Sequence, residues 1–73
     1  MNDAARFLSE LCRMTDGKEG AIVDPEDVAN AIALPVDAFQ PVLDVLAAQS
    51  LIGYSLINDL SVWLTAYGAA QCK

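Results

Sequence analysis

Residues 51–65 read Leu-Ile-Gly-Tyr-Ser-Leu-Ile-Asn-Asp-Leu-Ser-Val-Trp-Leu-Thr, and this stretch decides the fold. Apolar side chains recur at every second position on both sides of Asn58-Asp59, which is the pattern of a β-hairpin with its turn at that pair. A turn of two residues would place Tyr54 opposite Trp63. One face would then carry Ile57, Leu60, Val62 and Leu64, and the other would carry Ile52, Tyr54, Leu56 and Trp63.

Both faces of this hairpin are apolar, yet a hairpin packed on a small helical core buries only one of them. We therefore expect Tyr54, Leu56 and Trp63 to form a surface patch that binds protein, either a second copy of the chain or a larger partner. The alternative is that a last helix folds back and covers this face with Tyr67 and Ala70. Thr65 can cap that helix, which we expect from Ala66 to about Gln71.

The residues before the hairpin predict three helices, over about 3–14, 25–33 and 37–49. Asp24-Pro25 is the clearest start signal, because the carboxylate can cap the second helix and proline suits its first position. Leu34-Pro35-Val36 ends that helix. Asp37 is the expected cap of the third helix, in which Pro41 would crowd the preceding turn unless the helix begins later. The expected inward positions are Ala4, Phe7, Leu8, Leu11, Met14, Val28, Ala31, Ile32, Phe39, Val42, Leu43 and Leu46.

Between the first two helices, residues 15–20 form a loop with two glycines, and Ala21-Ile22-Val23 is long enough for a short edge strand. The whole chain, 1–73, is expected to be one domain, α+β and mostly helical.

This order of elements, helix, short strand, helix, turn, helix, hairpin and short helix, resembles a winged helix-turn-helix domain. Leu64-Thr65-Ala66-Tyr67-Gly68 resembles the Leu-Thr-x-x-Gly signature that closes the wing in small bacterial regulators of the multiple-antibiotic-resistance and PadR types. The segments 23–29, 34–36 and 42–52 resemble their helix entry, turn and third helix, although Ser50 stands where a glycine is usual. The resemblance implies a three-helix core, a two-stranded wing, and DNA binding through the third helix and the wing.

The distribution of charge argues against DNA binding. The chain has a formal net charge of -6, and no basic residue lies between Glu19 and Cys72. Affinity for DNA comes mainly from lysine and arginine at phosphates, and a carboxylate held about 4 Å from a phosphate costs on the order of 1 kcal/mol even in water. Gln40 could read an adenine edge. Only Arg6, Arg13 and Lys18 could contact phosphate, and they belong to the first helix and its loop.

The function expected first is therefore a non-enzymatic protein-interaction module, a homodimer or an adaptor. A DNA-binding transcriptional regulator is the alternative, and an acidic protein that imitates nucleic acid and blocks a basic protein is the third possibility. The acidic surface would repel anionic lipid, and no membrane contact is expected. No small-molecule substrate is evident.

No catalytic, metal or cofactor site is expected. The chain has no histidine, Glu26 and Asp27 belong to a helix start, and two cysteines alone do not make a zinc site. Because no basic segment followed by an apolar run begins the chain, a cytoplasmic location is expected. In such a reducing compartment Cys12 and Cys72 would be free thiols, with a disulfide between the terminal helices or between two chains as the alternatives.

Overall fold

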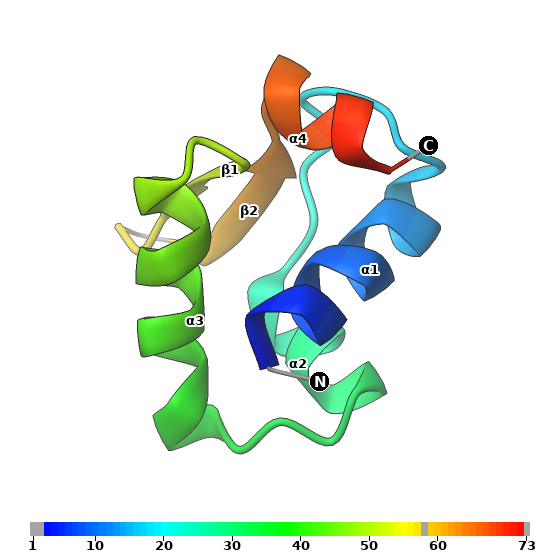
Figure 1. Cartoon of the computed structure of the whole chain (residues 1–73). Helices are drawn as coiled ribbons and strands as arrows, with labels where there is room; N and C mark the ends of the chain where they lie inside the picture. Colours follow the sequence, from blue (N-terminus) through cyan, green and yellow to red (C-terminus); the bar gives the residue numbers. More distant parts are fainter. Residues whose placement is uncertain (1–2, 58, 73) are drawn as a thin grey trace.

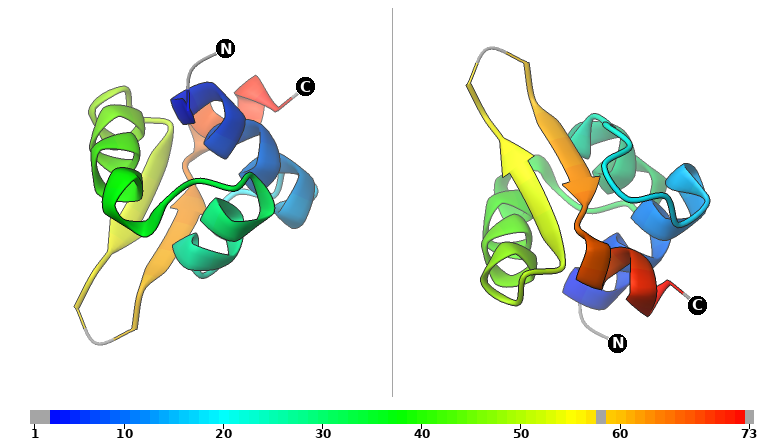
Figure 2. Two further views of the ribbon diagram at one scale, coloured as in Figure 1. Left: turned by 90° about the horizontal axis from the view of Figure 1, so that it is seen from below. Right: turned by 90° about the horizontal axis from the view of Figure 1, so that it is seen from above.

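The computed structural model describes residues 3–57 and 59–72, which form four helices and one two-stranded antiparallel sheet (Figure 1). The order is α1 (Asp3–Thr15), α2 (Pro25–Ala31), α3 (Val36–Ala48), β1 (Ile52–Ser55), β2 (Ser61–Leu64) and α4 (Ala66–Gln71). The mostly helical α+β class and the order of the helices and hairpin are confirmed. Helix α3 contacts β1, helices α1 and α4 contact β2, and the hairpin extends beyond the helices on the side of α3 (Figure 2).

Helix α1 crosses the centre of the fold and buries Phe7 and Leu11 completely. The prediction that Met14 lies inward is wrong: its side chain is 37% exposed, and Thr15 is buried in its place. Met14 follows Phe7 at i+7 and Thr15 follows Leu11 at i+4, so both positions border the buried stripe, and periodicity alone favours the apolar residue. Burial of Thr15 is tolerated because its hydroxyl donates to the carbonyl of Leu11 at 2.8 Å.

Helix α2 begins as its sequence predicts, with Asp24 accepting a 2.9 Å hydrogen bond from the backbone N–H of Glu26. Its buried residues are Pro25, Val28 and Ala29. One expected inward position is wrong, since Ala31 is exposed, whereas Ile32 is half-buried and packs against the core. The helix ends at Ala31, and Ala33 turns the chain with a φ of 56°, so the predicted last turn does not form.

Helix α3 buries its four predicted residues, Phe39, Val42, Leu43 and Leu46. It begins at Val36, one residue before the predicted start, and Asp37 is therefore inside the first turn rather than at the cap. Pro41 lies within the helix, where it leaves the carbonyl of Asp37 without its usual N–H partner.

The strand pairing differs from the prediction by one residue. Tyr54 pairs with Val62, Gly53 with Trp63 and Ser55 with Ser61, because residues 56–60 connect the strands in place of a two-residue turn. A shift of one residue turns every side chain of one strand to the other face. Ile52 therefore joins Val62 and Leu64 in the core, where all three are at most 3% exposed.

The expected edge strand is present only as two isolated bridges to β2. The backbones of Val23 and Val62 exchange hydrogen bonds of 2.9 and 2.8 Å, and the N–H of Gly20 donates to the carbonyl of Leu64 at 2.9 Å. Gly20 has a φ of 79°, so the segment turns between its two contacts and does not form a continuous ladder. It still covers the edge of β2 that β1 leaves free.

Helix α4 is capped by Thr65, whose hydroxyl oxygen accepts from the N–H of Gly68 at 3.0 Å and donates to the carbonyl of Ser50 at 2.5 Å. Gly68 explains how closely α4 packs: an added Cβ would lie 1.8 Å from the carbonyl oxygen of Leu51. The alternative in which Tyr67 and Ala70 cover the hairpin is wrong, because both are exposed and Tyr67 is 57% accessible.

Cys12 in α1 and Cys72 at the end of α4 form a disulfide with their Cα atoms 5.6 Å apart. The expectation of two free thiols is therefore wrong. A separation of 60 residues gave no indication of proximity, and the pair meets because α4 returns to lie beside α1 (Figure 1). The bond ties the C-terminal helix to the central helix.

Candidate interaction surface

The outer face of α3 and the hairpin loop combine carboxylates with exposed apolar side chains. We call this the α3–loop surface, and its residues are Asp37, Asp44, Val45, Leu56, Ile57 and Asp59, all exposed. Ile57 is 78% accessible and Val45 is 45% accessible. The two parts lie together because β1 packs beside α3, and the loop follows directly after β1 (Figure 2).

A hydrogen-bond network joins α3 to β1, the strand that leads into the hairpin loop. The hydroxyl of Tyr54 in β1 donates to Asp44 Oδ1 at 2.7 Å, and Gln40 Nε2 donates to the same oxygen at 3.2 Å. The hydrogen bond to Asp44, followed by desolvation and the negative charge of Asp44, raises the pKa of Tyr54 above its ordinary value. Asp44 is thus held in one orientation while it stays exposed to solvent.

The three residues of the predicted protein-binding patch do not share one face. Tyr54 is half-buried on the core side of the hairpin, whereas Trp63 lies across Gly53 on the other side. An added Cβ on Gly53 would be 2.5 Å from Trp63 Nε1, so the indole covers the backbone of β1. The predicted grouping is wrong because it depended on the two-residue turn. Leu56, 39% exposed at the end of β1, belongs to the α3–loop surface instead.

Sequence patterns did not identify Val45 as an exposed residue of this surface. It adjoins the buried stripe of α3, and an isolated valine at a helix position carries no signal of exposure. Ile57 was assigned to the packed face of the hairpin, whereas it lies beyond the end of β1.

The four candidate DNA contacts do not come together. The guanidinium of Arg6 donates to the carbonyl of Ile32 at the end of α2 and pairs with Asp3 at 3.4 Å. Arg13 donates to Glu10 within α1, and this ion pair lowers the pKa of Glu10 and raises that of Arg13. Lys18 lies in the loop after α1.

These three cations belong to α1 and its loop, with Arg13 in the last turn of α1 and Lys18 after its end. The C-terminal end of α1 lies on the side of the molecule away from α3 (Figure 1). Gln40 is the only one of the four on α3, where its amide is bonded to Asp44.

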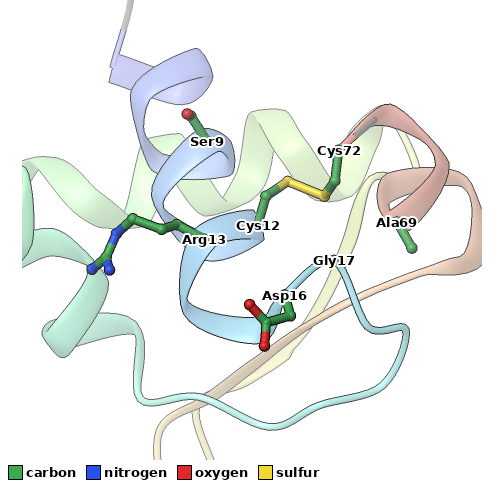
Figure 3. A pocket seen from close by; sticks show the side chains of 7 residues that line it. All are labelled: Ser9, Cys12, Arg13, Asp16, Gly17, Ala69 and Cys72. Carbon is green, nitrogen blue, oxygen red and sulfur yellow. A yellow bond between two sulfur atoms is a disulfide. The ribbon is translucent and has the colours of Figure 1, made fainter.

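Three clefts on the described part of the chain bear on its chemistry. Two of them flank the Cys12–Cys72 disulfide: one of about 350 Å³ with Arg13, Asp16 and Gly17 on its walls (Figure 3), and one of about 250 Å³ beside Leu8. A third, of about 320 Å³, lies between Ala4 in α1 and Val45 in α3. None of these three clefts brings together an acid, a base and a nucleophile, the groups that catalysis uses.

Among residues 3–57 and 59–72, no group of three or more metal-binding side chains lies close enough to hold an ion. Within the same residues, no helix has the length and apolar character needed to cross a membrane. The chain matches no protein-family profile, no curated protein and no solved structure.

Proposed function

We propose that this protein is a non-enzymatic protein-interaction module of winged-helix type, and that it contacts a partner protein through the α3–loop surface. The winged-helix assignment is supported by the order of the elements and by the contact of residues 19–23 with β2. The close approach of Gly68 to Leu51 also supports it, because it explains the glycine of the Leu-Thr-x-x-Gly segment. In a winged-helix domain, α3 and the hairpin loop would be the elements that approach DNA.

The observation that carries the proposal is the chemistry of these two elements. They present three carboxylates, Asp37, Asp44 and Asp59, and the chain has no lysine or arginine between residues 19 and 72. A duplex approaching α3 would meet fixed negative charge with no cation to release its counterions. Exposed Val45 and Ile57 would gain nothing from phosphate, but they would lose unfavourable contact with water in a protein interface.

Charge also favours a partner other than a second copy. In a symmetric dimer the same patch faces itself, so Asp37, Asp44 and Asp59 of one copy would approach the same acids of the other. No basic residue of the α3–loop surface could compensate for this repulsion. A partner with lysine or arginine around an apolar contact would pair with the carboxylates and cover Val45 and Ile57.

Two solution measurements test this proposal. Fluorescence anisotropy of a labelled mixed-sequence duplex should show no saturable binding at about 50 mM salt, where phosphate contacts are strong. Sedimentation equilibrium should give a monomer at high micromolar concentration.

Binding to the duplex that weakens as salt rises would favour the transcriptional regulator and overturn the proposal. A dimer abolished by Val45→Asp but not by Ile22→Asp, an exposed position in the 19–23 segment, would show that the partner is a second copy.

A further inference from the structure

We propose that the Cys12–Cys72 disulfide is a reversible exchange site for a dithiol reductant, and that its reduction releases the C-terminal end of α4 from α1. This inference does not depend on the protein-interaction proposal. Two observations support it: the attachments of α4 to the rest of the molecule are few, and clefts open beside the sulfur atoms.

Helix α4 has few attachments apart from the disulfide. It contains six residues, and a helix of that length is not stable in water by itself. Gly68 is its only fully buried residue; Ala69 is half-buried, and the large side chain of Tyr67 is mostly exposed. Helix α4 therefore gains little free energy from apolar burial.

The attachments of α4 are also uneven along its length. The N-terminal end is held by Thr65, whose N–H donates to Leu51 at 3.2 Å and whose hydroxyl donates to Ser50. At the C-terminal end the backbone N–H of Cys72 bonds only within the helix, to Ala69 at 3.1 Å. The disulfide is thus the covalent link between this end and α1, and the other contacts of this end with the core are those of the half-buried Ala69 and Cys72. Breaking the bond should free residues 69–72 while Thr65 keeps the start in place.

The sulfur atoms can be reached from outside. Cys12 and Cys72 are half-buried, and both line two clefts, one of which is shown in Figure 3. Each cleft is large enough to admit a small dithiol. The lining of the cleft in Figure 3 holds one positive and one negative side chain, Arg13 and Asp16, so its charge does not exclude a thiolate, the attacking species in exchange.

The exchange involves two electrons and proceeds in two steps. A thiolate of the dithiol attacks one sulfur of the bond, and the other sulfur leaves as a cysteine thiolate. The second thiol of the reductant, after losing its proton, attacks the mixed disulfide and displaces the remaining cysteine. The chain then carries two thiols after the thiolates take up protons, and the reductant is oxidised to its own disulfide.

The test compares oxidised and reduced protein under native conditions. After incubation with about 1 mM dithiothreitol, a thiol-alkylation assay should find both cysteines modified without denaturant. Hydrogen exchange followed by mass spectrometry should then show the amides of residues 69–72 exchanging roughly tenfold faster, with those of α3 unchanged. Oxidised dithiothreitol should restore the slow exchange.

Two variants complete the test. Cys72→Ser should show the fast exchange with or without reductant, whereas Ala70→Ser, an exposed neighbour in α4, should respond to reductant as the wild type does. Where Cys72→Ser does not fold, reduction and reoxidation of the wild type decide the question.

Three results would overturn the proposal. Cysteines that react only after denaturation would show that the bond is not an exchange site. Unchanged exchange at residues 69–72 after full reduction would show that α4 does not depend on the bond. Faster exchange throughout α3 would show that the disulfide stabilises the whole fold, and that its reduction does not act only on the end of α4.

Discussion

Gly68→Ala sets helix propensity against packing, and the structure predicts that packing prevails. Alanine is better than glycine in a helix by about 1 kcal/mol, so α4 considered alone should be stabilised. The added Cβ, however, would lie 1.8 Å from the carbonyl oxygen of Leu51, which is backbone and cannot rotate away. Helix α4 must therefore move outward by more than an ångström.

The cost of this movement can be estimated from the contacts that it breaks. Overpacking costs about 1–3 kcal/mol, and the hydrogen bond from Thr65 to Ser50 contributes about 1 kcal/mol more. After subtracting the gain in propensity, we expect Gly68→Ala to lower the free energy of unfolding by about 2 kcal/mol. In a domain of this size that corresponds to a fall in Tm of roughly 10 °C.

Urea unfolding followed by circular dichroism, with the disulfide intact, measures this change. Ala70→Gly is the matched control, because it alters propensity at an exposed position of the same helix and should cost about 1 kcal/mol. If Gly68→Ala raised the stability by as much as Ala70→Gly lowered it, propensity alone would be at work. The close approach of α4 to Leu51 would then be refuted.

Two further predictions concern the cap and the hairpin. Asp24→Ala should lower the unfolding free energy by about 1 kcal/mol in urea titrations, while Asp24→Asn, which keeps a capping oxygen, should leave it nearly unchanged. Because the folded-state pKa of Tyr54 is raised, its bond to Asp44 should stabilise the fold below the unfolded pKa of tyrosine, about 10, and this contribution should be lost as pH rises through the higher folded value. Tyr54→Phe should remove that part of the alkaline stability loss, and an unchanged profile would contradict the bond.

Local signals predicted most of the helical fold. Asp24-Pro25 marked the start of α2, the spacing of Phe39, Val42, Leu43 and Leu46 marked the buried face of α3, and Thr65 marked the start of α4. Each of these depends on residues within a few positions of one another, so the sequence carries them directly.

The errors arose where distant residues or a loop length decide the outcome. The length of the connection between β1 and β2 placed Tyr54 and Trp63 on opposite faces, and alternation alone does not fix that length. The disulfide depends on the return of α4 to α1, which no local pattern records. The same limits affected the candidate surface: its acids were visible in the sequence, but the exposure of Val45 and Ile57 required the structure.

Site-specific photo-crosslinking tests most directly whether the α3–loop surface binds protein. A benzophenone amino acid at position 45 would be irradiated in the cells from which the protein comes, with position 22, also exposed, as the control. The proposal predicts a discrete adduct at position 45 that resists nuclease, is removed by protease and is absent at position 22. A nuclease-sensitive adduct at position 45, or the same adducts at both positions, would contradict it.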